Sequence, residues 1–192
     1  MEYELGFAEG PETVPGGSGI LLVHPSTTDA DDFETAFLTA AAEPAMLIST
    51  HSAAREVKQK IEHYGVDQNR VEILDTISTD RGYTRRQEAG VTYLSAPDDV
   101  EGLLAATEDF LERRGAPARL SLDSITELGY YAGEEHLVEA LVGLLDQLSA
   151  HDAIGLFQLA ADGEAAVADL RDRFAGVVEV DDGGDIKADF RG

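Results

Sequence analysis

The feature that most constrains the fold of this chain is the alternation of short apolar runs with segments of helical periodicity. Short apolar runs are typical of buried strands, and apolar residues that recur at helical spacing are typical of amphipathic helices. Strands that alternate with helices form βαβ units, in which a parallel sheet lies between two layers of helices. The expected strands are 20–23, 45–49, 71–74, 91–94, 119–123, 153–160 and 176–180, and the expected helices are 31–42, 53–64, 98–114, 134–149 and 164–174.

Both ends of the chain depart from this alternation. Near the C-terminus, the sequence VVEVDDGGDIKADF places turn residues between two alternating runs, which predicts a β-hairpin. Near the N-terminus, the Gly- and Pro-rich segment 10–19 indicates a turn, so residues 1–17 are interpreted as a lead-in and residues 18–192 as one domain. We therefore expect an α/β protein, a three-layer sandwich whose mostly parallel sheet carries helices on both faces and ends in a C-terminal β-hairpin.

The charge of the chain restricts its partners. The formal net charge is −24, from 38 acidic and 14 basic residues, and such a surface repels a phosphate backbone. Nucleic acid is therefore not an expected partner. Molar salt would screen the self-repulsion of this charge, which favours a halophile as the source over a mesophile with an ordinary acidic protein.

Other classes are excluded by what the sequence lacks. The chain has no cysteine, which excludes disulfides and thiolate metal sites. No apolar run approaches the roughly 20 residues that span a bilayer, and the N-terminal sequence lacks the pattern of a secretory signal. We therefore expect a cytoplasmic protein with no membrane contact.

The sequence GILLVHPSTTDADDFETAFL, residues 19–38, has the layout of a phosphate-binding loop, with an apolar strand, a polar turn and an amphipathic helix. Such a loop needs the pattern GxxxxGK(S/T), in which backbone amides and a lysine hold phosphates and a hydroxyl holds magnesium. All four required residues are replaced here, in order by a histidine, an aspartate, an alanine and a second aspartate. The aligned positions 24–31 include His24, Thr28, Asp29, Ala30 and Asp31.

The acidic residues of this loop argue against ATP binding. A carboxylate about 4 Å from a phosphate charge costs on the order of 4 kcal/mol at an effective dielectric of about 20. The same acids suit the first turn of the following helix, where carboxylates accept amide hydrogens and favour the helix dipole. Asp31, followed three residues later by Glu34, has the form of a capping box.

A second candidate position is the end of the strand in RLSLDSITELGYY, residues 119–131. An acid at the end of a buried strand, here Asp123 followed by Ser124, has the form of a Walker B residue, which holds magnesium in nucleotide-hydrolysing folds. A strand that ends in Asp-Ser is also a common start for a helix cap, and the spacing alone favours the cap over the Walker B role.

The segments LDSITEL and DRFAGVVEV, with the strand and helix around the first loop, resemble the RecA/KaiC-type ATPase core over roughly residues 18–180, particularly degenerate RecA-like domain proteins of halophilic archaea. The resemblance implies a RecA-like fold in which the opening strand lies beside the strand of Asp123. The chain departs from the family where KaiC-like enzymes carry a glutamate pair that activates water, because residues 47–56 read LISTHSAARE. Of the positions that form the nucleotide site in this family, only those of Asp123 and Gln158 carry residues that suggest a role in that site.

The resemblance and its departures together imply a pseudo-ATPase, a RecA-like domain with no catalysis, no cofactor and no metal. It would act through a protein partner or self-association, in regulation or signalling. One alternative is a small-molecule or metal-dependent enzyme that uses His24, Asp29, Asp31 and Asp123 in the same crevice, since imidazole and carboxylate bind divalent metals. Another is an inactive ring subunit whose neighbour is an active ATPase.

The longest polar connection, residues 78–90, is a further candidate for function. Arginine and tyrosine are favoured at the centres of protein interfaces, which makes this segment a candidate interaction loop. The same cations would also offset an acidic surface if the loop were only solvated. The residues concerned are Arg81, Tyr83, Arg85 and Arg86.

Overall fold

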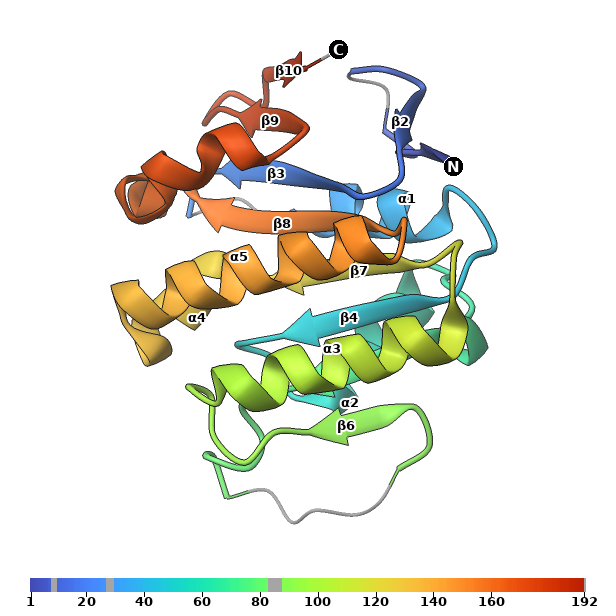
Figure 1. The fold of residues 1–192 in the computed structure, drawn as a ribbon, viewed down its shortest axis with the longest axis vertical. Helices are drawn as coiled ribbons and strands as arrows, with labels where there is room; N and C mark the ends of the chain where they lie inside the picture. The colour runs from blue at the N-terminus through green and yellow to red at the C-terminus, as the bar shows by residue number, and fades with distance from the viewer. Residues whose placement is uncertain (8–9, 27–29, 83–87, 192) are drawn as a thin grey trace.

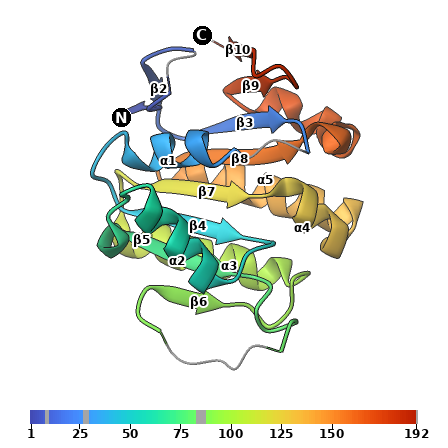
Figure 2. The same cartoon turned by 180° about the vertical axis from the view of Figure 1, so that it is seen from behind.

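The computed structural model describes residues 1–7, 10–26, 30–82 and 88–191. Among these residues, eight strands form one sheet in the order β10-β9-β3-β8-β7-β4-β5-β6, with helices on both faces (Figure 1, Figure 2). Neighbouring strands are parallel except β9 and β10, which form the antiparallel hairpin predicted at the C-terminus. The predicted three-layer α/β architecture is therefore confirmed. The strands are β3 (Ser18–His24), β4 (Ala45–Ser49), β5 (Val71–Asp75), β6 (Val91–Tyr93), β7 (Arg119–Asp123), β8 (Ile154–Ala160), β9 (Gly176–Val180) and β10 (Ile186–Phe190).

The helices divide between the two faces of the sheet. Within β3, Leu21 and Val23 pack into the core on one side, and Ile20 and Leu22 pack into the core on the other, as the two-residue repeat of a strand requires. The first core includes side chains of α3 and α5 and the second includes side chains of α1 and α2. No helix in the described ranges is both long enough and apolar enough to cross a bilayer. The helices are α1 (Asp31–Thr39), α2 (Ala54–His63), α3 (Val100–Arg114), α4 (Ile125–Ala132) and α5 (Glu134–Ala150), with 3-10 segments η1 (Gln68–Arg70) and η2 (Ala161–Arg173).

The prediction that the opening strand lies beside the strand of Asp123 is wrong. β8 lies between β3 and β7 and pairs in parallel with both of them. All seven residues of β8 are buried, and a strand of this kind is stabilised by neighbours along both of its edges. The first loop and the end of β7 nevertheless meet at the same end of the sheet, because all three strands run in one direction (Figure 1).

The segment predicted as a helix over 164–174 is instead the 3-10 segment η2. Its buried residues, Val167 and Leu170, are three positions apart, which matches the three residues per turn of a 3-10 helix. The short helix α4 was not predicted from the sequence.

The N-terminal lead-in forms a small hairpin of β1 (Glu2–Glu4) and β2 (Thr13–Pro15). The side chains of Tyr3, Leu5 and Val14 are buried in the core beside α1 and α2. The Tyr3 hydroxyl donates a hydrogen bond to the Asp152 carbonyl at 2.8 Å and accepts one from the Ala118 amide at 3.2 Å. The lead-in is thus anchored to loops at the end of the sheet where the strands begin.

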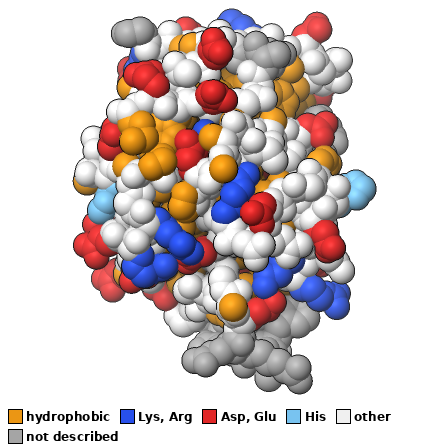
Figure 3. All heavy atoms as spheres, turned by 90° about the vertical axis from the view of Figure 1, so that its right-hand side faces the viewer, with side chains coloured by type: hydrophobic (Ala, Val, Ile, Leu, Met, Phe, Trp, Pro, Cys, Tyr) orange, Lys and Arg blue, Asp and Glu red, His pale blue; other side chains and the backbone are white. Residues whose placement is uncertain are grey.

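Acidic and basic side chains lie next to one another on that side of the molecule, which faces the viewer in Figure 3. Glu72 accepts hydrogen bonds from the guanidinium groups of both Arg113 and Arg114, at 2.6–3.3 Å. Deeper in the structure, the fully buried Arg119 pairs with Glu43 and donates to the Phe37 carbonyl at 3.0 Å. These contacts attach the ends of α1 and α3 to the sheet.

Candidate functional site

Three carboxylates meet where the first loop and the end of β7 come together. Asp31 and Glu34 lie in the first turn of α1, and Asp123 is the last residue of β7. One carboxylate oxygen from each lies within 4.8 Å of the others. This convergence of negative charge requires a cation or a proton to stabilise it, since like charges at this distance repel.

The cation is the side chain of Lys60, which reaches the cluster from α2. Its Nζ lies 2.7 Å from Glu34 Oε2, 2.9 Å from Asp31 Oδ1 and 3.3 Å from Asp123 Oδ2. An ammonium group has three N–H donors, and each has a carboxylate acceptor here. The Lys60 side chain is 16% exposed and that of Glu34 is fully buried, so the central pair is shielded from water.

The second oxygen of Glu34 is also satisfied. Glu34 Oε1 accepts a hydrogen bond from Ser121 Oγ at 2.5 Å and one from Gln158 Nε2 at 3.1 Å. Ser121 comes from β7 and Gln158 from β8, so the insertion of β8 beside β7 supplies part of this network. Gln158, which the sequence suggested as a nucleotide-site position, is therefore a hydrogen-bond partner of the buried Glu34 carboxylate.

The charges of this cluster are mutually dependent. Burial raises the pKa of the Glu34 carboxyl, against the lowering effect of Lys60. Burial lowers the pKa of the Lys60 ammonium, but the charges of Glu34 and Asp123 outweigh this and hold that pKa well above its usual range. Lys60 therefore keeps its proton at neutral pH and remains the cation of the site.

A pocket of about 340 Å³ opens beside Asp123 and includes His24, His51, Ser124 and Asp162 in its lining. The Nδ1 atom of His51 lies 3.6 Å from Asp123 Oδ1, and the Nδ1 atom of His24 lies 3.0 Å from the Pro25 carbonyl oxygen. Asp123 therefore stands between an internal ammonium on one side and a solvent-facing imidazole on the other.

The end of β7 is held in place by contacts with β4 and α4. Thr50 Oγ1 accepts a hydrogen bond from the Ser124 amide at 2.8 Å, and its one hydroxyl proton is shared between the carbonyls of Asp123 and Ser124, each at 3.1 Å. Ser124 Oγ accepts from the Glu127 amide at 3.3 Å, so Ser124 is the N-cap of α4. The cap role suggested for Ser124 by the sequence is confirmed.

The predicted capping box of Asp31 and Glu34 is wrong. The N-cap residue of α1 is Ala30, whose side chain makes no capping hydrogen bond, and Asp31 is the first helical residue. Glu34 points into the sheet because Lys60, Ser121 and Gln158 offer it three donors there, whereas a capping geometry would direct it back along the helix.

The remaining predicted positions have mixed outcomes. Thr28, Asp29, Tyr83, Arg85 and Arg86 lie outside the described residues. Arg81 is exposed, and its backbone amide donates to the Ile77 carbonyl.

Sequence reasoning did not assign a role to Lys60, the central residue of the cluster. The one sequence signal that could have drawn attention to it is the rarity of lysine, because the chain contains only Lys58, Lys60 and Lys187 against 38 acidic residues. The spacing of Lys60 along α2 could not show which carboxylates it meets, since they come from α1 and β7.

Comparisons with known proteins place the fold. The chain matches the protein family described as "Family of unknown function (DUF7090)" over residues 1–190, and it belongs to that family. No curated protein matches it. Among solved structures, it is similar to the KaiC-like protein PH0186 of the hyperthermophilic archaeon Pyrococcus horikoshii OT3, with 18% identity and a TM-score of 0.67 over 98% of this chain and 85% of that chain. This likeness shows a RecA-like α/β fold.

Proposed function

We propose that this member of the DUF7090 family is a RecA-like domain that does not hydrolyse ATP and acts through contacts with proteins. The observation that carries the proposal is the position of the Lys60 ammonium, which is hydrogen-bonded to Asp31, Glu34 and Asp123 together. Those carboxylates include the Walker B-like acid of the fold. An internal ammonium thus takes the place in which this kind of site would hold magnesium.

Lys60 also does not replace the missing phosphate-binding lysine. All three of its N–H donors have carboxylate acceptors, so a phosphate would have to displace at least one of them. The acids that would be left behind repel a phosphate at short range. In the loop itself, the lysine position of the motif is occupied by Ala30, a buried residue with no donor in its side chain.

The direct test is isothermal titration of the chain with ATP and magnesium at molar salt, followed by an assay for phosphate release. We expect no saturable binding in the micromolar range and no turnover, because the cation site is filled and the phosphate donors are absent. Micromolar binding, with or without turnover, would contradict the proposal.

The pocket beside Asp123 supports a second candidate, a small-molecule or metal-dependent enzyme. The observation in its favour is that His24 and His51 line one pocket with Asp123, and both imidazole and carboxylate can bind divalent metals. Among the described residues, however, the ligand atoms that lie within 4.8 Å of one another belong to Asp31, Glu34 and Asp123, not to the two histidines. Titration with zinc, compared between the native chain and the variants H24A and H51A, separates the candidates. Tight zinc binding that each substitution abolishes would favour the enzyme. Weak zinc binding that neither substitution changes would exclude a metal-dependent enzyme at this pocket.

A further inference from the structure

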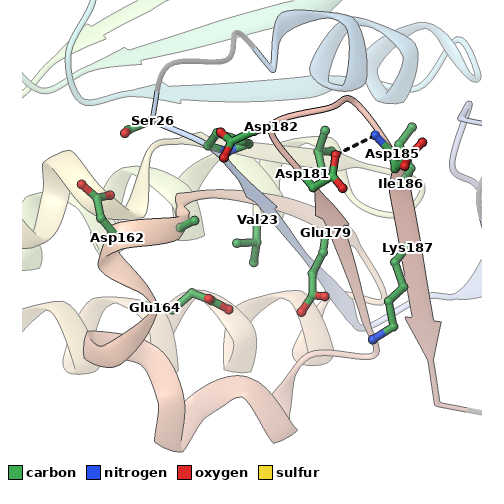
Figure 4. A pocket seen from close by; sticks show the side chains of 13 residues that line it. Val23, Ser26, Asp162, Glu164, Glu179, Asp181, Asp182, Asp185, Ile186 and Lys187 are labelled. Carbon is green, nitrogen blue, oxygen red and sulfur yellow. Dashed lines mark hydrogen bonds between the residues drawn. The ribbon is translucent and has the colours of Figure 1, made fainter.

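A groove of about 690 Å³ lies between the β9–β10 hairpin, η2 and the end of β3 (Figure 4). Its volume is within the range of about 300–1,000 Å³ that is typical of ligand sites. Apolar side chains from three strands contribute to its lining, and they are separated by acidic side chains. The apolar residues from these strands are Val23, Val180 and Ile186, and they are joined by Pro25, just beyond β3, and Ala161, at the start of η2.

The acidic residues of the groove come from two elements that face each other. Asp162 and Glu164 belong to η2, and Glu179, Asp181, Asp182 and Asp185 belong to the hairpin. Among the described residues of the lining, Lys187 is the single basic one, and it lies directly opposite Glu179 in the ladder of β9 and β10. The groove therefore has a strong excess of negative charge.

Part of this charge is already balanced and part is not. Arg171 bridges Glu164, at 2.7 Å, and Glu179. Asp181 Oδ1 accepts hydrogen bonds from the amides of Gly183 and Asp185, which shape the turn. Within the described residues, the exposed carboxylates of Asp162, Asp182 and Asp185 have no cationic partner. These three charges are available to a molecule that enters the groove.

The arrangement of the acids distinguishes between cationic ligands. Among the described residues, the carboxylates that converge closely enough to hold one metal ion are those of Asp31, Glu34 and Asp123, and the groove supplies none of them. Its charges are instead distributed around apolar side chains over the length of the groove. A ligand that matches them carries several separated cations with apolar groups between, which describes an extended protein segment of alternating basic and apolar residues.

We propose that this groove docks a basic protein segment in which lysine or arginine alternates with apolar residues. The carboxylates of Asp162, Asp182 and Asp185 pair with its cations, and the apolar lining near Val23 and Ile186 receives its apolar side chains. This inference rests on the proposed function, since it names the surface and the partner chemistry of a domain that acts through protein contacts.

The experiment uses the full chain and a peptide of alternating lysine and leucine as the probe, with binding followed by fluorescence anisotropy. The test variant D162N/D182N/D185N removes three exposed charges from the groove without touching the turn hydrogen bonds of Asp181. The matched control D98N/E101Q/E139Q removes three exposed charges from another acidic region, beside His136. Circular dichroism establishes that both variants fold.

We expect saturable binding of the peptide to the native chain, about tenfold weaker binding to the groove variant, and unchanged binding to the control. A peptide of alternating lysine and serine should bind more weakly than the leucine peptide, because it cannot use the apolar lining. Absence of binding to the native chain, or an equal loss in both variants, would overturn the proposal. So would equal affinity for the serine peptide.

Two other occupants are tested in the same series. Spermine that binds as tightly as the leucine peptide, with the same loss in the groove variant, would identify a small polycation as the ligand and overturn the proposal. Native self-association that the groove variant abolishes, measured by light scattering, would assign the groove to a second copy and overturn it as well. Failure of this inference is separate from failure of the proposed function, which depends on the ATP titration alone.

Discussion

At the scale of single residues, the distinctive feature of the molecule is Lys60, whose ammonium neutralises the cluster of carboxylates at the end of β7. The Lys60 ammonium lies 2.7 Å from the Glu34 carboxylate; the Lys60 side chain is mostly buried, and that of Glu34 has no exposed surface. Removing one member of a buried pair leaves the other charge without compensation, which is far more costly than losing an exposed ion pair. The same carboxylates would attract a metal ion if the ammonium were absent.

The substitution K60M is therefore expected to lower the free energy of unfolding by about 3–5 kcal/mol. Saturating Mn²⁺ should restore part of this loss, because Asp31, Glu34 and Asp123 are close enough to share one ion. Both effects are measured by denaturant unfolding with and without the metal. The native chain should show no comparable stabilisation.

The control is K58M on the same helix, which removes a more exposed pair with Glu88 and should cost no more than about 1 kcal/mol. If the two variants lost similar stability, Lys60 would be an ordinary surface lysine. If Mn²⁺ stabilised the native chain as much as K60M, the ammonium would not be occupying the cation site.

At the scale of elements, ion pairs and buried hydroxyls determine how the helices and the N-terminal hairpin attach to the sheet. Burial of Glu72 favours its protonated form, but the hydrogen bonds from Arg113 and Arg114 outweigh this and lower the pKa of its carboxyl. This contact joins the last turn of α3 to β5. A carboxyl with a lowered pKa in the folded state stabilises the fold above its unfolded pKa of about 4.3.

We expect E72Q to reduce stability by about 1 kcal/mol at neutral pH, since the arginines are partly exposed and the interaction is screened. The difference from the native chain should vanish as the pH falls through the lowered pKa of Glu72, because the native carboxyl then becomes protonated too. Unfolding curves measured from neutral to acidic pH follow this change. The exposed Glu112, on the same helix, provides the control E112Q, and an equal effect of that substitution would contradict the assignment.

The N-terminal hairpin should contribute directly to the stability of the domain. Y3F keeps the buried ring but removes the acceptor of the Ala118 amide and the donor to the Asp152 carbonyl. Leaving a buried amide unpaired costs about 1–3 kcal/mol, which thermal or chemical unfolding would detect. Y130F, at a tyrosine that is 79% exposed, should have almost no effect. If Y3F did not change the stability, the hairpin would be only loosely attached to the domain.

The elements that the sequence predicted are those whose signal is local. The strands β4, β7 and β9 were predicted with their observed limits, because their apolar runs are bounded by clear polar or turn residues. The position of β8 between β3 and β7 was not predictable from periodicity, which carries no information on strand order. The hairpin of β1 and β2 was missed because its strands are only three residues long.

The candidate site was only partly predictable for the same reason. Asp31, Asp123 and Gln158 were selected because each was expected at the end of a strand or the start of a helix, although Gln158 lies two residues before the end of β8. Lys60, the partner of Asp31 and Asp123, comes from a different helix. The partner of Gln158 is Glu34, which was assigned to capping because its local pattern fits a capping box. Both the missed role of Lys60 and the actual role of Glu34 depend on contacts between segments that are distant in the sequence.

At the scale of the whole molecule, the charge of −24 should make the stability strongly dependent on salt. At low ionic strength the exposed acids repel one another over about 10 Å or more, whereas at molar salt the Debye length falls to about 3 Å. We expect the unfolding temperature to rise steadily with potassium chloride concentration. The unfolding temperature of a variant with three fewer acids, such as D98N/E101Q/E139Q, should rise less steeply with salt. An unfolding temperature of the native chain that did not change with salt concentration would contradict this view of the surface.

The central claim is that the Lys60 ammonium fills the crevice in which a nucleotide-bound cation would otherwise sit. The most direct measurement is NMR of the lysine ammonium groups, which is simplified by the presence of only three lysines in the chain. K58M and K187M assign the other two signals. We predict that the Lys60 signal is protected from exchange with water and remains unchanged when ATP and magnesium are added. A Lys60 signal that exchanges as fast as those of Lys58 and Lys187, or that shifts when nucleotide is added, would contradict the account.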